Sequence, residues 1–380
     1  MKHVGSALLL VMIGVSLPPS LLARQFERAV YYNVGTHDLP YYVVSGQLTN
    51  SGNFDLAVAD YLNSQVSILL GNGDGTFQKP KRFTVPNPIG LAIGDFNGDQ
   101  KEDLAVVSSG GTGSGSLCMY LGQGDGTFHL SACYTAGIEP ILVATADFNG
   151  DGNLDVAVAD KAGYKNAGSV TVFFGTGKGT LKNPATYKVT GAPYGIAAGD
   201  LNGDRHPDLV VTDVSGGNAI VLLNDGTGKF QKPVVYSVGG GEAVDVKIAD
   251  LRHDGRNDLA VVNASINEIA ILLNNGDGTF APAKFYISGF SWGTGTDAVV
   301  IADFNLDGKL DLATANQNGN SALLYGRGDG TFKAAVPIHD EIKFDGAISL
   351  TVGDFNNDKA PDLAFAMYFK NKIAVMINTR

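Results

Sequence analysis

Short apolar runs separated by polar turns follow one another along almost the whole chain. An alternating run such as residues 90–94 (GLAIG) precedes an Asp-rich loop, and a continuous apolar run such as residues 104–107 (LAVV) follows it. A third run, as in residues 66–70 (VSILL), leads into a Gly-rich turn, as in residues 73–77 (GDGTF), where glycine supplies the positive φ angles of a tight hairpin. A more polar fourth run leads to the next unit. Such runs between turn residues are typical of strands, so the pattern predicts four strands per unit.

This unit occurs seven times. Its Asp-rich loop begins at residues 47, 95, 147, 200, 250, 303 and 354, a period of about fifty residues. Four strands in each of seven such units are typical of propeller blades and not of a solenoid. We therefore predict an all-β fold, a seven-bladed β-propeller with four antiparallel strands per blade.

The two ends of the chain are predicted to complete one blade together. The seventh unit ends at residues 377–380, directly after its third strand, and residues 26–34 form a spare strand-like run before the first unit. An N-terminal strand that closes the last blade leaves no open sheet edge. Residues 24–380 then form a single propeller domain with no linker.

Residues 1–23 have the pattern of an export signal. Lys2 and His3 precede an apolar run over residues 4–17, and cleavage is expected after Ala23. The alternative is a membrane anchor, but about fourteen apolar residues are fewer than the ~20 that a spanning helix needs. We expect a secreted, periplasmic or cell-surface protein, with no membrane insertion after signal removal.

Charge and motifs exclude other classes of function. The chain has 27 Lys and Arg against 38 Asp and Glu, a net charge of −11, which argues against a nucleic-acid partner because phosphate binding needs a basic face. Nucleophile elbows, His-rich metal sites and phosphate loops are lacking, and the six histidines are scattered. We therefore expect a protein that is not an enzyme.

The Asp-rich loops carry oxygen side chains at relative positions 1, 3, 5 and 9. Ca²⁺ takes about six to eight oxygen ligands, and this spacing supplies Asp, Asn, Asp, a main-chain carbonyl at position 7 and a closing Asp. Zinc prefers His or Cys, and Mg²⁺ prefers a smaller octahedral shell. The alternative, that these aspartates only cap turns, leaves three carboxylates per loop without a counter-charge. The predicted ligands of five Ca²⁺ ions are Asp95, Asn97, Asp99 and Asp103; Asp147, Asn149, Asp151 and Asp155; Asp200, Asn202, Asp204 and Asp208; Asp303, Asn305, Asp307 and Asp311; and Asp354, Asn356, Asp358 and Asp362.

Two loops depart from this pattern. In the fifth unit Arg252 stands at position 3, where its guanidinium could bridge Asp250, Asp254 or Asp258 and replace the ion. In the first unit Asp55 is the only acid, and no tight site is expected there. Five bound Ca²⁺ would bring the net charge from −11 to about −1, so we expect the fold to depend on its ions.

The face opposite these loops is the expected place for a ligand. Trp292, the only tryptophan, either stacks on a sugar ring or partner there, or wedges between blades. Residues at the end of the second strand recur as Asp or Asn, for which turn capping is favoured over a repeated lectin site. These capping candidates are Asp60, Asp160, Asp213, Asn263 and Asn316. The ligand candidates are His37, Asp38, Tyr61, Glu139, Tyr164, Tyr194, Glu242, Trp292 and Asp297.

Cys118 and Cys133 flank the hairpin of the second unit almost symmetrically. In register they would lie opposite each other on neighbouring strands. We expect a disulfide between them in an oxidising compartment.

The repeats resemble the FG-GAP or VCBS-type family of the integrin α-subunit propeller and of many secreted bacterial proteins. The resemblance rests on residues 93–99 (IGDFNGD) with residues 103–106 (DLAV), and on residues 70–77 (LGNGDGTF). It implies that the Asp-rich loop joins the first two strands of each blade and holds Ca²⁺. Members of the family act as adhesion receptors, as seven-bladed fungal lectins and as scaffolds of some polysaccharide lyases. We expect a binding or adhesion module for a protein or glycan partner, with a lectin as the alternative and a lyase-type enzyme third.

Overall fold

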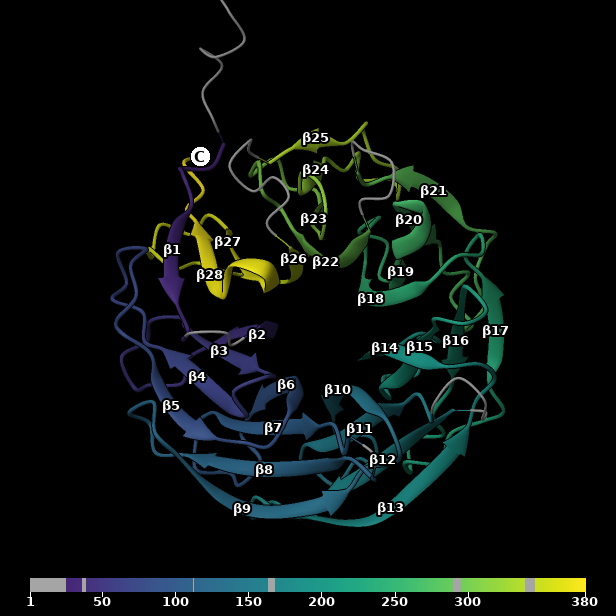
Figure 1. Ribbon diagram of the computed structural model, residues 1–380. Helices are drawn as coiled ribbons and strands as arrows, with labels where there is room; N and C mark the ends of the chain where they lie inside the picture. The colour runs from purple at the N-terminus through teal and green to yellow at the C-terminus, as the bar shows by residue number, and fades with distance from the viewer. Residues whose placement is uncertain (1–24, 36–38, 112, 163–167, 290–294, 339–345) are drawn as a thin grey trace, which may run out of the picture.

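Seven four-stranded antiparallel sheets form a closed ring in the computed structural model, which confirms the predicted β-propeller (Figure 1). The structure describes residues 25–35, 39–111, 113–162, 168–289, 295–338 and 346–380. The predicted export signal lies outside these residues. No helix within the described residues is long and apolar enough to cross a membrane.

Each of blades 1 to 6 takes its four strands in chain order, from the centre of the ring outward. Blade 1 contains β2 (Pro40–Gly46), β3 (Asp55–Asp60), β4 (Gln65–Leu69) and β5 (Lys81–Thr84); blade 2 contains β6 (Pro88–Gly94), β7 (Asp103–Ser108), β8 (Ser116–Gly122) and β9 (Phe128–Thr135); and blade 3 contains β10 (Pro140–Ala146), β11 (Asp155–Asp160), β12 (Ser169–Gly175) and β13 (Leu181–Lys188).

The remaining blades follow the same order around the ring. Blade 4 contains β14 (Pro193–Gly199), β15 (Asp208–Asp213), β16 (Asn218–Leu222) and β17 (Val234–Ser237); blade 5 contains β18 (Ala243–Ala249), β19 (Asp258–Asn263), β20 (Glu268–Leu272) and β21 (Lys284–Ile287); blade 6 contains β22 (Thr296–Ala302), β23 (Asp311–Asn316), β24 (Ala322–Leu324) and β25 (Val336–Pro337); and blade 7 contains β26 (Ala347–Gly353), β27 (Asp362–Met367), β28 (Lys372–Met376) and β1 (Val30–Asn33). Two short 3-10 helices, η2 (Ala264–Ile266) and η4 (Tyr368–Lys370), follow β19 and β27.

The continuous apolar runs are second strands that neighbouring blades cover on both faces. Every residue of β3 (DLAVAD) and of β7 (DLAVVS) is buried, whereas the outer strand β17 (VVYS) is largely exposed. Between blades 1 and 2, Ala57 and Val66 belong to the same apolar cluster as Leu91 and Val106. Small side chains suit these strands because the blades pack face to face, and this packing makes a core between each pair of blades.

The N-terminal strand closes the ring as predicted. β1 pairs antiparallel with β28, with Val30 opposite Val375 and Asn33 opposite Lys372. Outside this strand, Phe26 forms a bridge with Asn378, and its ring lies edge-on to that of Phe304 at 6.0 Å between centroids. The last blade therefore depends on residues from both ends of the chain.

The Gly-rich turns fasten each blade to the one before it. In blade 1, Asp74 Oδ1 accepts hydrogen bonds from the Thr76 N–H (3.0 Å) and hydroxyl (2.5 Å), which shapes the turn. Gly75 has a φ of +82°, and a Cβ there would lie 2.8 Å from Ile377 of blade 7. Glycine is required at this position both by the backbone and by the close approach of the neighbouring blade.

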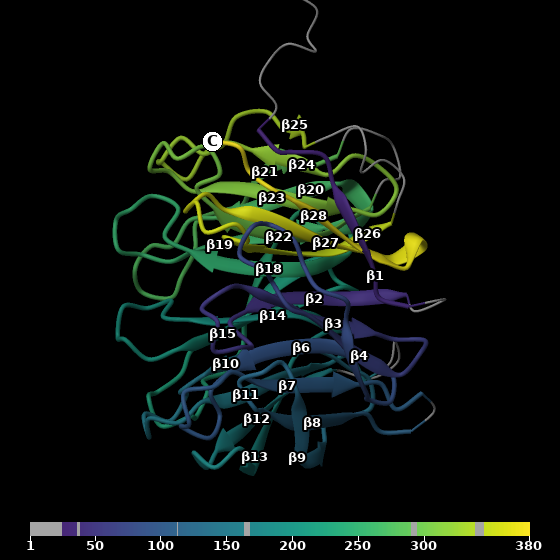
Figure 2. The same cartoon turned by 90° about the vertical axis from the view of Figure 1, so that its left-hand side faces the viewer.

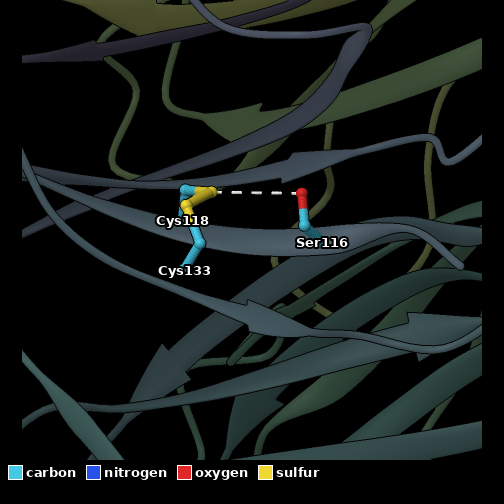
Figure 3. The surroundings of a disulfide bond; sticks show 3 residues. All are labelled: Ser116, Cys118 and Cys133. Atoms are coloured by element: carbon cyan, nitrogen blue, oxygen red, sulfur yellow. Dashed lines mark hydrogen bonds between the residues drawn. A yellow bond between two sulfur atoms is a disulfide. The ribbon is translucent and has the colours of Figure 1, made fainter.

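The disulfide expected in the second unit is present between β8 and β9 (Figure 3). Cys118 and Cys133 are directly opposite in the register of the two strands, and their Cα atoms are 4.1 Å apart. Ser116 Oγ lies 3.9 Å from the sulfur of Cys118. The bridge joins the outermost strand of blade 2 to its inner neighbour.

Candidate functional site

The Asp-rich loops and the Gly-rich turns lie on one face of the ring, which we call the loop face. Each Asp-rich loop connects the first strand of a blade to the second, as residues 95–102 connect β6 to β7. The turn of the following blade reaches this loop: the Gly179 N–H donates to the Phe96 carbonyl at 2.9 Å, and the Gly75 N–H donates to the Phe355 carbonyl at 2.9 Å. The opposite face therefore carries the connections from second to third strands and from blade to blade, as Figure 2 shows with the ring edge-on.

We call the five loops with Asp, Asn, Asp and Asp at positions 1, 3, 5 and 9 the regular loops. In each of them the backbone curls around the side chain of the aspartate at position 1. In blade 2, Asp95 Oδ1 accepts hydrogen bonds from the Gly98 and Asp99 amides at 2.7 and 3.2 Å, and Asp95 Oδ2 accepts one from the Gln100 amide at 2.8 Å. Asn97 Oδ1 accepts a second hydrogen bond from the Asp99 amide at 2.9 Å. This arrangement is an extended Asx turn, and it turns the side chains of positions 1, 3 and 5 toward one part of the loop.

The aspartate at position 9 begins the second strand and is buried in every blade. In blade 2, Asp103 Oδ2 accepts a hydrogen bond from the Phe96 amide at 3.0 Å, and Oδ1 accepts one from the Gly122 amide at 2.8 Å. This carboxylate thus fastens the loop to the end of the third strand. It is the one acid of the pattern that blade 1 retains: Asp55 Oδ1 accepts a hydrogen bond from the Gly71 amide at 2.8 Å.

Burial raises the pKa of these position-9 carboxyls, and the aspartates at positions 1 and 5 of the same loop raise it further. The pKa is about 6 for Asp155, Asp208 and Asp311 and about 7 for Asp362. Hydrogen bonds from the backbone oppose this increase but do not cancel it. In blades 2, 3 and 6 the position-5 aspartate pairs with a lysine, Lys101, Lys182 or Lys309, but among the described residues no salt bridge reaches the buried position-9 carboxylate of a regular loop.

The donors of these loops are of the type that Ca²⁺ prefers, because they are all carboxylate and amide oxygens. The side chains at positions 1, 3 and 5 accept hydrogen bonds from amides of their own loop, and the position-9 carboxylate also accepts one from the end of the third strand. Among the residues that the structure describes, no three His, Cys, Asp or Glu side chains form a group that could hold a metal ion. Ca²⁺ at the twenty predicted ligand residues stays a prediction, which the donor chemistry and the uncompensated charge support.

In blade 5 a side chain supplies the positive charge. Arg252 Nη2 and Nε donate to the two carboxylate oxygens of Asp258 at 2.7 and 3.1 Å, and Nη1 lies 3.1 Å from Asp254 Oδ2. Nη2 also donates to the Asn274 carbonyl at 2.8 Å. The predicted bridge is confirmed for Asp254 and Asp258, while Asp250 accepts hydrogen bonds from the loop amides of Asp254 and Gly255.

In blade 1 the acids at positions 1 and 5 are absent. Thr49 Oγ1 at position 3 donates to Asp55 Oδ2 at 3.1 Å, and the Thr49 and Ser51 hydroxyls are 2.8 Å apart. Gln47 and Ser51 stand here in place of the two aspartates, and Thr49 stands in place of the asparagine. The expectation that this loop holds no tight site stays a prediction, which the lack of acids at positions 1 and 5 supports.

A cavity of about 350 Å³ lies at the opposite face, at the end of the central channel. Its lining residues stand where first strands begin and where second strands end, which is the end of each blade away from the Asp-rich loops. We call it the channel-mouth cavity. It is lined by Tyr41, Tyr42, Leu142, Lys161, Tyr194, Val214, Glu242, Val244, Asp245, Ala264, Asp297, Ala298, Gln317, Ile348 and Tyr368.

The cavity unites three of the ligand candidates named from the sequence, Tyr194, Glu242 and Asp297. Tyr61 packs behind it, with its ring 6.2 Å from that of Tyr41, and Glu139 lies 3.6 Å from the ammonium of Lys161. The candidates outside the described residues are His37, Asp38, Tyr164 and Trp292. The sequence did not single out Tyr41, Tyr368, Lys161 or Asp245, which also line the cavity.

Asp297 has an unusual environment in this cavity. Burial raises the pKa of its carboxyl to about 7, and the nearby charge of Glu242 adds to the increase. Its Oδ2 atom is buried and has no hydrogen-bond partner among the described residues. Close by, the Tyr41 and Tyr194 hydroxyls are hydrogen-bonded at 2.8 Å, and Lys247 Nζ donates to both oxygens of Asp245 at 2.7 and 2.9 Å.

The Asp and Asn side chains at the ends of the second strands cap connections between blades, as favoured from the sequence. Asp160 Oδ1 accepts hydrogen bonds from the Glu139 and Ala162 amides at 2.7 and 3.1 Å, and the Asn316 amide donates to the Ser288 carbonyl at 2.8 Å. The corresponding residues of the other blades are also buried. These side chains are therefore occupied in holding the blades together.

Comparison with solved structures supports the fold. A lectin of Agrocybe aegerita that recognises non-reducing terminal N-acetylglucosamine is 20% identical, with 86% of each chain covered and a TM-score of 0.56. BBS1N, solved in complex with ARL6DN, is 13% identical, with 94% of this chain and 98% of that chain covered and a TM-score of 0.61. A putative 6-phosphogluconolactonase of Bacteroides fragilis is 15% identical, with 91% and 95% covered and a TM-score of 0.62. These identities establish a shared architecture alone, since one fold supports many functions.

Comparison at the level of sequence identifies the repeats. No curated protein matches the chain significantly. The model of the FG-GAP-like repeat matches six times, and each match runs from one Asp-rich loop into the second strand of the next blade. The matched residues are 48–106, 95–158, 147–211, 200–261, 250–314 and 303–365. With most of its length covered by these repeats, the chain belongs to the FG-GAP-like repeat family.

Proposed function

We propose that this protein is an extracytoplasmic, non-catalytic binding module that holds Ca²⁺ in its loop face and takes a protein or glycan partner on the opposite face. One observation carries the proposal. The channel-mouth cavity combines aromatic rings with Asp297, whose Oδ2 is buried without a donor. A carboxylate with an unsatisfied oxygen is costly for a folded protein, and a ligand that interacts with the carboxylate group can offset part of that cost.

The two faces of the ring differ in how their polar residues are used, and this difference supports the same proposal. On the loop face, acids at recurring positions serve the loops themselves, through hydrogen bonds and through the predicted ions. On the opposite face, the lining residues differ from blade to blade, as expected of a surface that recognises something outside the protein. A carbohydrate is the favoured partner class within this proposal, because tyrosine rings suit sugar faces and a lectin shares the architecture.

A glycan array on the calcium-loaded protein tests this proposal, together with capture of protein partners from an extracellular fraction. We expect binding that Tyr194→Ala in the cavity abolishes. Tyr236→Ala, a matched change on the outer strand of blade 4, is expected to leave binding intact. Binding that survives Tyr194→Ala would place the partner elsewhere and contradict the proposed face. Release of unsaturated uronate from an acidic polysaccharide would contradict the non-catalytic role.

Export is tested separately, since it depends on residues 1–23. We expect full-length protein to appear outside the cytoplasm with an N-terminus beginning at Arg24, and a version without residues 1–23 to remain inside. N-terminal sequencing of the exported protein measures this. Retention of the uncleaved chain in the membrane fraction would favour the anchor alternative.

A further inference from the structure

The channel-mouth cavity departs from the repeat at one position in particular. The second residue of each first strand stands at the same place around the ring, and in six blades it is apolar or aromatic. These residues are Tyr41, Ile89, Ile141, Tyr194, Val244 and Ile348. In blade 6 the equivalent residue is Asp297. A buried carboxylate in a ring of apolar positions destabilises the fold, so its presence requires a reason other than packing.

The charges that line the cavity do not balance. Asp245 is neutralised by Lys247 at 2.7 Å, and Lys161 lies 3.6 Å from Glu139. Among the described residues these are the salt bridges at the cavity, which leaves Glu242 and Asp297 without a cation. The cavity thus presents two uncompensated carboxylates.

The walls of the cavity also suit a cation. The ring centroids of Tyr41 and Tyr368 are 6.4 Å apart, and the interplanar angle is 74°. Tyr42 and Tyr194 also line the cavity. Tyrosine ring faces carry negative electrostatic potential and attract ammonium groups within about 6 Å. Aromatic rings and carboxylates on the walls of one cavity therefore favour the same class of ligand.

We propose that the channel-mouth cavity binds a small organic ammonium ion, with an N–H of the ligand donating to the Asp297 carboxylate and its charge balanced by Asp297 and Glu242. This inference rests on the proposed function and names its ligand class. A primary or secondary ammonium fits best, because a quaternary ammonium has no N–H to donate to the carboxylate. A neutral sugar could donate a hydroxyl but would leave the charge uncompensated. The source of the ammonium is either a free amine or an amino sugar.

Binding of this ligand is coupled to deprotonation of Asp297. With the pKa of its carboxyl near 7, Asp297 is partly protonated at neutral pH, and a cation binds the ionised form. Affinity therefore increases as the pH rises through about 7 and decreases below it. The titratable and charged groups that face Asp297 around the cavity are Glu242, Asp245 with Lys247, Lys161, Tyr41, Tyr194 and Tyr368.

Calorimetric titration of the calcium-loaded protein with four probes tests the inference. Glucosamine and putrescine carry primary ammonium groups, N-acetylglucosamine is the neutral counterpart of glucosamine, and choline is quaternary. We expect glucosamine to bind at least about tenfold more tightly than N-acetylglucosamine, and either amine to bind more tightly than choline. Binding of both amines indicates a free-amine ligand, and binding of glucosamine alone indicates an amino sugar.

Asp297→Asn is the decisive variant, because it keeps the shape of the side chain and removes a buried charge, so folding is expected to persist. It should weaken binding of the amine about tenfold or more and remove the pH dependence. Asp125→Asn, at an exposed turn of the loop face, is the matched control and should change neither. Equal binding of glucosamine and N-acetylglucosamine, or no binding of either amine at millimolar concentration, would overturn the inference. The array and the Tyr194→Ala variant would still decide the proposed function independently.

Discussion

Blades 4 and 5 are neighbours with matching scaffolds, and they differ in how they handle the charge of the Asp-rich loop. In both, the position-9 aspartate accepts a hydrogen bond from an asparagine amide that follows the third strand: the distance is 2.7 Å from Asn224 to Asp208 and 2.8 Å from Asn274 to Asp258. In blade 5 the guanidinium of Arg252 lies among the carboxylates. In blade 4 position 3 is Asn202, and no side chain among the described residues forms a salt bridge with the aspartates of this loop.

The difference indicates what the loop requires. Three aspartates around a buried strand end need positive charge, either from an ion or from a guanidinium. Blade 1 gives a third arrangement, since Gln47 and Ser51 stand in place of the aspartates at positions 1 and 5 and only Asp55 is left as an acid. The backbone hydrogen bonds to the position-9 aspartate persist in all three types of loop. The fold thus preserves the hydrogen bond between the position-9 aspartate and the end of the third strand, and the loops differ in how much charge they carry and how it is balanced.

Removing calcium should have the largest effect, because it acts on the five regular loops and spares blades 1 and 5. Each site filled at about one hundred times its dissociation constant contributes about 2.7 kcal/mol to the stability of the folded state. We expect a chelator to lower the thermal midpoint by more than about 10 °C. Added Ca²⁺ should restore it, and Mg²⁺ should do so less well. A melting curve that a chelator does not change would contradict the comparison.

Arg252→Met should have the next largest effect, and it acts on blade 5 alone. It leaves Asp258 buried without its bidentate partner, at a cost of about 3 kcal/mol, whether or not calcium is present. Arg256→Gln is the matched control: Arg256 also pairs with Asp254 but is more exposed, so the loss of stability should be much smaller than for Arg252→Met.

Arg252→Asn sharpens the same test, because it restores the ligand pattern of the regular loops. We expect this variant to be as unstable as Arg252→Met in a chelator and to recover in calcium with one additional bound ion, measured by equilibrium dialysis. If the stability of the variant recovers without added calcium, or if calcium does not change its stability, Arg252 does not take the place of an ion.

The dependence of stability on pH should differ in sign with and without calcium. In the ion-free protein the pKa of Asp362 is about 7 and that of Asp208 about 6, above the value of about 3.9 in the unfolded chain. The folded state then binds more protons than the unfolded state between these values, so stability increases as the pH falls from about 7.5 to 5. With calcium bound, protons compete with the ion, and stability decreases over the same range.

Thermal midpoints measured across this range in chelator and in calcium give the two slopes. Asp362→Asn should reduce the slope in chelator, whereas Asp74→Asn, at an exposed turn, should leave it unchanged. Parallel slopes in the two buffers would contradict the charge deficit assigned to the regular loops.

The features that recur or are local in sequence could be predicted. The period of about fifty residues determines the blades, the missing fourth strand at the C-terminus implies closure by β1, and the symmetric placement of Cys118 and Cys133 implies their pairing. The substitution at Arg252 could be recognised because five of the six other copies have Asn at position 3. Because the blades repeat, contacts between distant parts of the chain can be inferred from a pattern within a single sequence.

The channel-mouth cavity could be predicted only in part. Its lining residues come from separate blades, and they differ in chemical type and in their position within the blade. Examples are Tyr41 in blade 1, Lys161 after β11 and Tyr368 in η4. No short motif joins such residues, because only closure of the ring brings them together. One signal was present: an alignment of the seven first strands at their second residue would have shown Asp297 among apolar and aromatic residues.

Asn202→Arg should have the smallest effect, and it tests the comparison from the side of blade 4. The surroundings of the two side chains match: a Cβ at Gly278 would lie 3.4 Å from Asn202 Cβ, and one at Gly330 would lie 3.2 Å from Arg252 Cγ. The introduced guanidinium should therefore reach Asp204 and Asp208 as Arg252 reaches their counterparts.

In calcium this variant should lose one bound ion and keep nearly the same thermal midpoint, while the loss of stability caused by a chelator should shrink by about one fifth, because one of five sites no longer needs its ion. Asn202→Met is the control, since it fills the same space without the charge and should be less stable in both buffers. If Asn202→Arg behaves like Asn202→Met, a guanidinium cannot serve a regular loop. The stabilising effect of Arg252 would then depend on features of blade 5 other than the charge of its three aspartates.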